Sequence, residues 1–319
     1  NLPYAVALNS GLDALILGLR ALDIGPGDEV ITPPNSYIAS SGAIGLLGAR
    51  PVFVDVRADY NINPNAIEAA IGGKTKAIMP VHLTGRPCEM DTIREIADRH
   101  SIPIIEDAAQ SITARYKNKA TGSLGTIGCF SLHPLKTLNA CGDGGVVTTG
   151  DPKIYQRLLQ LRNHGLKNRD ECVEWGYNSR LDSIQAAILL VKLKHIEEWT
   201  EQRRNNAKLY QTDLNGVGDL ILPDDQEHEY SAYHTFIIRT KNRDALNTYL
   251  REHGVGTGVH YPIPVHLQEA ATYLGYDPGD FPETELQATE ILSLPIHQGL
   301  VQEDLSYVVD CVKSFFEIT

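Results

Sequence analysis

The chain has 319 residues, of which 42% are hydrophobic and 21% charged, an ordinary composition for a globular protein of one large or two domains. Its formal net charge of −12 argues against general binding to nucleic acid or to an anionic membrane surface. No apolar run reaches about 18 residues, so no membrane-spanning helix is predicted, and the first residues lack the pattern of a signal peptide. Five scattered cysteines without a C-x-x-C pair indicate reduced thiols in a cytoplasmic protein and no zinc or other metal site.

The first half of the chain alternates apolar strands with helices. Strands are predicted at residues 4–8, 29–32, 51–56, 75–82, 102–107, 126–131 and 145–149. Helices are predicted at residues 12–22, 39–47, 65–71, 90–100 and 152–162, and a long one at 183–215. Strand–helix–strand repeats of this length indicate an α/β fold with a mostly parallel sheet that helices cover on both faces.

The last third of the chain has a different pattern. A strand is predicted at 233–240, a helix at 243–253, a loop rich in proline and histidine at 259–268 and a closing helix at 302–317. This order of elements is typical of a smaller α+β unit. We therefore predict a large domain over residues 1–205 and a small C-terminal domain over residues 206–319.

Polar residues follow several of the predicted strands. Because ligands of such sheets bind beyond the carboxyl ends of the strands, we expect Ser10, Tyr37, His82 and Asp107 along one edge. Asp107 ends a buried strand, where a carboxylate is costly to bury unless it is paired. It either caps the segment that follows or faces a cationic nitrogen of a ligand.

A lysine lies near the same edge. Lys136 follows the strand predicted to end at Ser131 and precedes a glycine-rich turn at 142–145. Such a lysine is usually solvated, but here the Ser131 hydroxyl could bind a phosphate and the glycines allow a bulky ligand to approach. A lysine for a Schiff base and an aspartate for a pyridinium nitrogen are what pyridoxal 5′-phosphate (PLP) requires. Residues 9–11 could offer backbone N–H groups to its phosphate, and Tyr37 an aromatic ring to its face.

Seven stretches, in order over essentially the whole chain, carry a resemblance to a known family. They are residues 5–11, 80–85, 105–110, 130–136, 161–165, 176–180 and 258–268. With them the sequence resembles the DegT/DnrJ/StrS sugar aminotransferases, which are PLP enzymes of fold type I. The resemblance implies a large domain with a mostly parallel seven-stranded sheet between helices, and a smaller α+β C-terminal domain.

The resemblance also implies roles for individual residues. Lys136 is implied as the catalytic lysine that forms the internal aldimine, and Asp107 as the catalytic partner of the pyridinium nitrogen. Gln110 would contact the region of the ring hydroxyl and Tyr37 would stack on the ring. The implied cofactor-binding set is Ser10, Gly11, Leu12, Tyr37, Asp107, Gln110, Ser131, Lys136 and Asn178.

Two of these positions have further consequences. Asn178 matches an asparagine that reaches the phosphate of the neighbouring subunit's cofactor, so the resemblance implies a homodimer with shared active sites. Leu12 stands where family members commonly have threonine, so a hydroxyl contact to the phosphate would be missing while the backbone N–H remains. Fold type I enzymes also carry an N-terminal helical segment before the first strand, and we expect that segment to be absent from this sequence, which begins almost at the strand.

The substrate is inferred from the second half of the chain. The loop with His260 and Tyr261 is similar to that of enzymes that aminate C3 of nucleotide-linked 3-keto sugars, although it could also be a proline-stiffened domain junction. Arg162, His164 and His260 could provide local positive charge for a diphosphate. Arg162 and His164 could equally be ordinary polar packing.

The resemblance therefore implies a PLP-dependent transaminase of the EC 2.6.1 class. It would move an amino group from L-glutamate to a nucleotide-linked keto sugar in two ping-pong half-reactions, with Lys136 moving the proton. Alternatives are an aminotransferase of a keto-cyclitol and a non-catalytic PLP-binding regulatory protein. A PLP-dependent sugar dehydratase is disfavoured because its relatives have histidine in place of Lys136. A nicotinamide dehydrogenase is disfavoured because no G-x-G-x-x-G follows the first strand.

Overall fold

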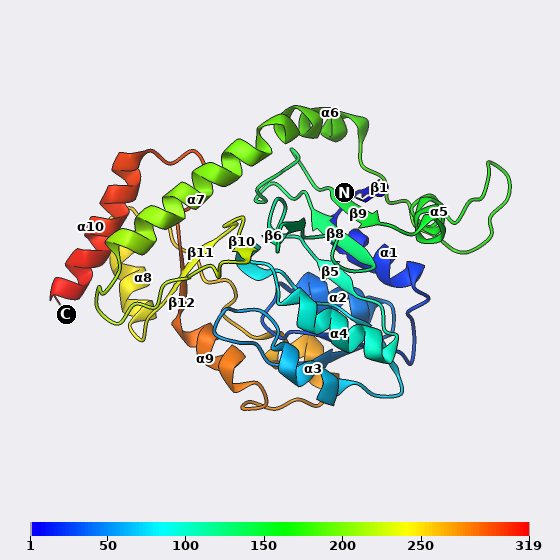
Figure 1. Cartoon of the computed structure of the whole chain (residues 1–319), viewed down its shortest axis with the longest axis horizontal. Coiled ribbons are helices and arrows are strands. Elements are labelled where there is room, and N and C mark those ends of the chain that lie inside the picture. The colour runs from blue at the N-terminus through cyan, green and yellow to red at the C-terminus, as the bar shows by residue number, and fades with distance from the viewer. Residues whose placement is uncertain (1, 319) are drawn as a thin grey trace.

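The computed structural model describes residues 2–318, which form a central sheet between helices and a second, smaller unit toward the C-terminus (Figure 1). The strands of the central sheet are β1 (Tyr4–Leu8), β2 (Glu29–Thr32), β3 (Arg50–Phe53), β4 (Thr75–Ile78), β5 (Ile105–Asp107), β8 (Ile127–Ser131) and β9 (Gly145–Thr149). Its helices are α1 (Gly11–Ala21), α2 (Ile38–Leu46), α3 (Pro64–Ala70), α4 (Met90–His100) and α5 (Pro152–Leu161).

The sheet consists of two hydrogen-bonded sets, in the orders β1-β9-β8-β5 and β3-β2-β4. Parallel bridges from Ile78 to Ile104 and from Val81 to Asp107 join them, which gives the continuous order β1-β9-β8-β5-β4-β2-β3. Strand β9 is antiparallel to both of its neighbours, and the other pairs are parallel. The mostly parallel seven-stranded sheet predicted from the sequence is confirmed.

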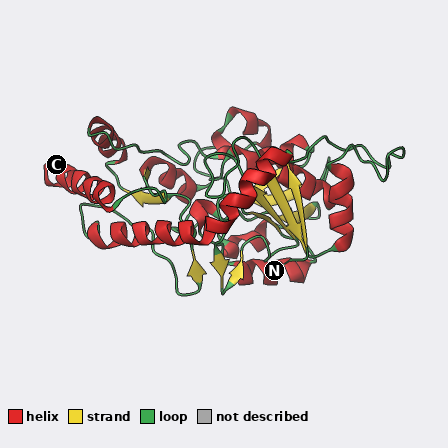
Figure 2. Ribbon diagram, turned by 90° about the horizontal axis from the view of Figure 1, so that it is seen from above, coloured by secondary structure: helices red, strands yellow, loops and turns green. Residues whose placement is uncertain are grey.

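Successive residues of the buried strands point to opposite faces of the sheet, so each face has its own core. Val30 and Ile105 pack with α1 and α5 on one face, whereas Ile31 and Ile104 pack with α3 and α4 on the other. Figure 2 shows the sheet edge-on between these helices. This burial on both faces explains why the strands read as continuous apolar runs.

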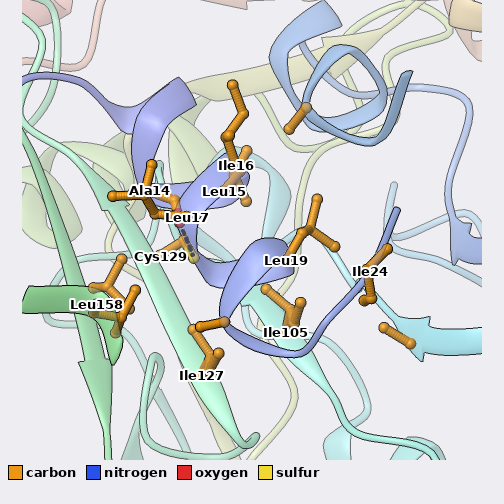
Figure 3. Packing of buried hydrophobic residues seen from close by; sticks show 14 of the residues in the cluster. Ala14, Leu15, Ile16, Leu17, Leu19, Ile24, Ile105, Ile127, Cys129 and Leu158 are labelled. Atoms are coloured by element: carbon orange, nitrogen blue, oxygen red, sulfur yellow. Dashed lines mark hydrogen bonds between the residues drawn. The ribbon is translucent and has the colours of Figure 1, made fainter. Parts of the chain in front are cut away.

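Helix α1 is buried on nearly all sides. Figure 3 shows Leu15 and Leu19 of this helix among side chains of β5, β8 and α5. The Cys129 thiol of β8 donates to the carbonyl of Ala14 at 3.2 Å, and an added Cβ at Gly18 would lie 3.2 Å from the same sulfur. The close packing fixes the N-terminus of α1 against the ends of β8 and β9.

The C-terminal unit has a core of its own. Its elements are α7 (Ile196–Asp213), β11 (Phe236–Arg239), α8 (Arg243–Glu252), α9 (Pro282–Glu290), β12 (Ile291–Leu294) and α10 (Gln302–Ile318). Strands β11 and β12 pair antiparallel, and Tyr210, Phe236, Leu250 and Val312 are among the residues buried between them and the helices. The small α+β unit predicted for this region is thus observed.

The predicted helix at 183–215 consists of three consecutive helical segments, which run across the top of Figure 1. They are α6 (Ser183–Lys192), a 3-10 turn (Leu193–His195) and α7. The expected boundary between residues 205 and 206 falls within α7, whose Ala207 and Tyr210 belong to the C-terminal core. The division into domains 1–205 and 206–319 itself stays a prediction.

Several short elements were not predicted. Strands β6 (Arg115–Tyr116), β7 (Lys119–Ala120) and β10 (Glu229–Tyr230) form a small sheet of their own, and 3-10 turns occur at Leu83–Gly85, Val265–Leu267 and Glu269–Leu274. Helix α9 packs back on the large unit, where the Asp55 carboxylate accepts the backbone N–H groups of Glu283 and Thr284 at 3.0 Å each. Within residues 2–318, no helix is both long and apolar enough to cross a membrane.

Candidate active site

The carboxyl ends of β1, β5 and β8 share one edge of the sheet, because these three strands run in the same direction. Ser10 follows β1, Asp107 ends β5 and Ser131 ends β8. The edge therefore brings together residues that are far apart in the sequence, as the strand pattern predicted. Lys136 lies five residues after the end of β8, and the chain there comes back to the same set of polar residues.

Asp107 is a buried carboxylate, with 4% of the residue exposed. Its Oδ2 accepts the Ser40 hydroxyl at 2.6 Å and its Oδ1 accepts the backbone N–H of Ala109 at 3.1 Å. The second bond caps the turn that follows, which is not the helix considered from the sequence. The ligand-facing role of Asp107 stays a prediction. Within the part of the chain that the structure describes, Asp107 forms no ion pair, and its negative charge is left for a cationic group of a ligand.

Lys136 lies close enough to Asp107 to be influenced by its charge. Burial lowers the pKa of the Lys136 amine, and the nearby carboxylate raises it in part, with burial the larger effect. A lysine held in this way has a larger neutral fraction than a solvated one. The neutral amine is the nucleophile that a carbonyl ligand requires.

The start of α1 forms a narrow cradle. Ser10 caps the helix, its Oγ accepting the N–H of Asp13 at 3.0 Å. A Cβ at Gly11 would lie 2.6 Å from Cβ of Ser131, and one at Gly145 would lie 2.0 Å from the carbonyl oxygen of Ser10. Only glycine fits at either position, so the first backbone N–H groups of α1 stay open toward the Ser131 hydroxyl, an arrangement suited to a phosphate.

Leu12 follows in the cradle and supplies no hydroxyl. Its side chain turns away and packs against the core cluster around α1. The contribution of this position to a phosphate is therefore limited to its backbone N–H, as expected from the sequence.

Two tyrosines and a glutamine lie beside Asp107. Tyr37 precedes α2, is 58% exposed and has its ring centre 5.6 Å from that of Tyr261. Gln110 accepts the N–H of Thr84 at 2.7 Å through Oε1 and donates through Nε2 to the Tyr261 hydroxyl at 3.3 Å. Burial and the Asp107 charge raise the pKa of Tyr261, which keeps the phenol protonated. The His260–Tyr261 loop thus contacts the cofactor-side residues directly.

Two histidines lie close enough to Lys136 to be influenced by its charge. Burial and the Lys136 charge lower the pKa of His260, whose Nδ1 lies 2.8 Å from the Ser293 hydroxyl. His260 is therefore a neutral hydrogen-bonding group rather than the cation expected for a diphosphate. Burial, Lys136 and Arg203 lower the pKa of His234 still further, and its Nδ1 is buried without a hydrogen-bond partner. His234 was not identified from the sequence, where it lies inside the strand predicted at 233–240 and carries no motif.

Three of the predicted residues lie on the loop between α5 and α6, which projects from the body of the molecule in Figure 1. Arg162 donates through Nη1 to the carbonyl of Ala7 at 2.8 Å, which favours the polar-packing interpretation of this residue. His164 is exposed with φ near 60°, and Asn178 is exposed and bridged to Asn163. None of these contacts joins them to Lys136 within this chain.

His82 differs from the expectation that it lines the ligand edge. Its backbone N–H does donate to the carbonyl of Asp107 at 3.1 Å, but its side chain is fully buried. Nδ1 accepts the N–H of Cys88 at 3.0 Å, so the proton is on Nε2, which donates to Oε2 of Glu106 at 2.9 Å. The His82 side chain therefore contacts Glu106 of β5 and is not directed into the site.

These residues meet the demands of the expected cofactor. A backbone cradle that any Cβ would fill suits a phosphate, and a buried carboxylate without an ion pair suits a pyridinium nitrogen. A lysine with a lowered pKa is suited to react, through its neutral amine, with the carbonyl carbon of the cofactor. The three requirements are satisfied at one edge of the sheet, so the site fits PLP.

Comparison with known proteins agrees with this geometry. The sequence model of the DegT/DnrJ/EryC1/StrS aminotransferase family matches residues 1–313. The dTDP-3-amino-3,4,6-trideoxy-α-D-glucose transaminase of Streptomyces venezuelae is 43% identical over 317 residues, which cover 98% of this chain and 83% of that protein. The pleiotropic regulatory protein of Geobacillus stearothermophilus is 44% identical over 316 residues, which cover 98% of this chain and 85% of that protein.

Solved structures give the same result. The crystal structure of S. venezuelae DesV in complex with a ketimine intermediate has a TM-score of 0.97 at 42% identity and covers 99% of this chain and 86% of that one. The PLP form of the sugar aminotransferase Spr1654 of Streptococcus pneumoniae has a TM-score of 0.93 at 29% identity and covers 99% and 88%. The chain belongs to the DegT/DnrJ/EryC1/StrS family of PLP-dependent aminotransferases.

Proposed function

We propose that this aminotransferase moves an amino group from L-glutamate to the C3 keto group of a nucleotide-linked sugar. The observation that carries the proposal is the position of Lys136, whose pKa is lowered, near the buried carboxylate of Asp107 and the cradle of α1. This arrangement supports amino-group chemistry on a carbonyl substrate.

The choice of sugar and carbon is supported by the relatives. An enzyme of Acidithiobacillus ferrooxidans, 42% identical, is named as a UDP-N-acetyl-3-dehydro-α-D-glucosamine 3-aminotransferase. An enzyme of Pseudomonas aeruginosa, 41% identical, is named as a UDP-2-acetamido-2-deoxy-3-oxo-D-glucuronate aminotransferase. Both names, like that of the S. venezuelae transaminase, place the reacting group at carbon 3 of a nucleotide-linked sugar. The proposal also places the reaction in the cytoplasm, where the free thiols of this chain would stay reduced.

Each residue of the site has a different role in the proposed reaction. When bound, PLP supplies an electron sink for the bond electrons released at the substrate carbon. Asp107 holds a proton at the ring nitrogen through its charge. Once freed, Nζ of Lys136 takes a proton from the α carbon of the amino donor, because its lowered pKa keeps part of it neutral. Tyr261 and Gln110 close the site on the side of the C-terminal unit.

One set of measurements tests separately the amino donor, the amino acceptor and the carbon that receives the amino group. Addition of L-glutamate alone should remove the visible absorbance of the lysine-bound cofactor, and addition of a UDP- or dTDP-linked 3-keto sugar should restore it. Mass spectrometry and NMR of the product should then show an amino group at C3. An amine at C4, a response to glutamine only, or conversion of a keto-inositol but of no nucleotide sugar would each refute the corresponding part of the proposal.

Lys136→Ala provides the control for the chemistry. The variant should fold, as judged by circular dichroism, but show no lysine-linked absorbance and no half-reaction. An unchanged absorbance spectrum would refute the assignment of Lys136.

The active form is a homodimer in this proposal. Helix α6 exposes Ile184, Leu190 and Val191 at 70%, 65% and 60%, and the neighbouring loops expose Leu135 at 78% and Trp175 at 87%. Exposed large apolar side chains on one helix and the loops next to it are typical of a surface that a second copy covers. The loop that carries Trp175 also carries Asn178, which would then reach the phosphate of the partner's cofactor.

Sedimentation analysis tests the dimer directly. A mass of two chains is expected, and Asn178→Ala should weaken PLP binding several-fold without changing that mass. A mass equal to one chain in the active enzyme would refute the shared site.

A further inference from the structure

Ser40 belongs to the first turn of α2 and is 1% exposed. Its hydroxyl oxygen lies 2.6 Å from Oδ2 of Asp107, a residue 67 positions away in the sequence. Because an ionised carboxylate can only accept hydrogen bonds, the hydroxyl is the donor. A short hydroxyl-to-carboxylate bond of this kind is charge-assisted and stronger than a bond between neutral groups.

The neighbouring residue is a buried serine that lacks such a bond. Ser41 is also buried, at 6%, and its hydroxyl has no hydrogen-bond partner. Two adjacent serines on one helix therefore differ mainly in whether they contact Asp107.

The same turn of α2 carries a second group of the site. The backbone N–H of Ser40 donates to the carbonyl of Tyr37 at 3.2 Å, and Tyr37 presents its exposed ring beside Tyr261. The partial positive charge at the start of α2 also favours the carboxylate that Ser40 contacts. One helical turn thus holds both the aromatic ring and the donor to the aspartate.

We propose that Ser40 is a positioning residue, which keeps Asp107 ionised and oriented so that the cofactor's ring nitrogen stays protonated. This rests on the proposed roles of Asp107 and Lys136. Without the hydroxyl, the carboxylate would more readily take the proton from the ring nitrogen, leaving two neutral groups in the buried site. Less positive charge on the ring would let the nitrogen that joins Lys136 to the cofactor keep its proton to a higher pH.

The test is a pH titration of the cofactor's visible absorbance in the holoenzyme. For Ser40→Ala we expect the midpoint to rise by at most about one pH unit, the shift that corresponds to loss of one hydrogen bond to a charged group, because that bond acts on Asp107 and reaches the titrating nitrogen only through the ring. Transamination should slow about tenfold or more, in line with the same loss in the transition state. Ser40→Thr, which keeps the hydroxyl, and Ser41→Ala, the matched control, should both titrate like the wild type.

Melting temperatures separate positioning from stability. A Ser40→Ala protein that melts lower but titrates with the wild-type midpoint overturns the inference. If Ser40→Ala does not fold, Ser40→Cys, with its weaker S–H donor, should shift the midpoint in the same direction by less, and an unshifted midpoint overturns the inference. A wild-type protein that shows no lysine-linked absorbance refutes the proposed site itself, which the Ser40 variants alone do not.

Discussion

Gly11 and Ser131 touch so closely that no side chain fits between them: a Cβ at Gly11 would lie 2.6 Å from Cβ of Ser131. The contact joins the start of α1 to the end of β8, two elements separated by more than a hundred residues. It fixes the width of the cradle in which the phosphate of the cofactor is expected to bind.

Gly11→Ala should therefore widen the cradle and strain the junction. We expect a loss of about 1–3 kcal/mol in the free energy of unfolding, typical of overpacking. The apparent Kd for PLP should rise about tenfold or more, because the backbone N–H groups move from their positions. Denaturant titration and fluorescence titration with PLP measure the two effects.

Gly42→Ala is the matched control. Gly42 is in α2, and an added Cβ there would meet nothing within 4 Å. The substitution should stabilise the protein by about 0.5–1 kcal/mol, through the better helix propensity of alanine, and leave PLP affinity unchanged. Equal losses in both variants would show that the Gly11–Ser131 contact has no special role.

The buried carboxylate of Glu106 is expected to matter for stability rather than for binding. It accepts four donors, namely Nε2 of His82 and the backbone N–H groups of Gly122, Leu124 and Gly125, at 2.9, 2.7, 2.7 and 2.6 Å. In Glu106→Gln the amide NH₂ would face donors, so at least one buried N–H would lose its acceptor. We expect a loss of about 3–5 kcal/mol, measured by urea unfolding of the apoprotein.

The exposed Glu227 serves as the reference for that experiment. Glu227→Gln should change the free energy of unfolding by less than about 0.5 kcal/mol. A Glu106→Gln protein as stable as this control would mean that the loop at 122–125 is not held by the carboxylate.

The hydrogen bond between Gln110 and Tyr261 predicts a substrate effect that does not depend on pH. Tyr261→Phe removes the hydroxyl but keeps the ring against Tyr37, so KM for the keto sugar should rise because the loop is held less firmly. The free energy of one hydrogen bond sets the upper limit of the rise at about fivefold. Because the pKa of Tyr261 is raised by burial, the phenol stays protonated, and the ratio of wild-type to variant KM should be constant from about pH 6 to 9.

A double-mutant cycle with Gln110→Ala checks that the two residues act as a pair. The coupling free energy in KM should be about 1 kcal/mol. Strictly additive effects would show that the 3.3 Å contact carries no binding energy.

Much of this architecture follows from local patterns in the sequence. The apolar runs of β1 to β5 and the helical repeat of α1 are local features, and the rule that ligands bind at the carboxyl ends of strands places Ser10, Asp107 and Ser131 correctly. The short strands β6 and β7 of two residues each have no periodicity to detect.

The residues that were missed depend on contacts across the fold. Ser40 becomes informative only when its hydroxyl meets Asp107, and His234 only when burial places it near Lys136. His82 follows the same strand-end pattern as Asp107, but its side chain turns to Glu106 on the other side of β5. Strand periodicity fixes which residues end a strand, whereas the surroundings of each side chain depend on the neighbouring strands and loops.

The charges of Lys136 and Asp107 make a final prediction about the apoprotein. PLP attaches only to the neutral amine, so the attachment rate should rise with pH until it passes the pKa of Lys136, which burial lowers from its usual value. The Asp107 carboxylate opposes this effect by favouring the charged amine. Asp107→Asn removes the opposing charge, so the pH midpoint of the attachment rate should move further down, even though most transaminase activity is lost.

Stopped-flow absorbance at a series of pH values measures the midpoint. Asp143→Asn, an exposed carboxylate in the following turn, should leave it unchanged. A midpoint that stays fixed or moves up in Asp107→Asn would mean that the two side chains do not interact, and the assignment of Asp107 would have to be abandoned.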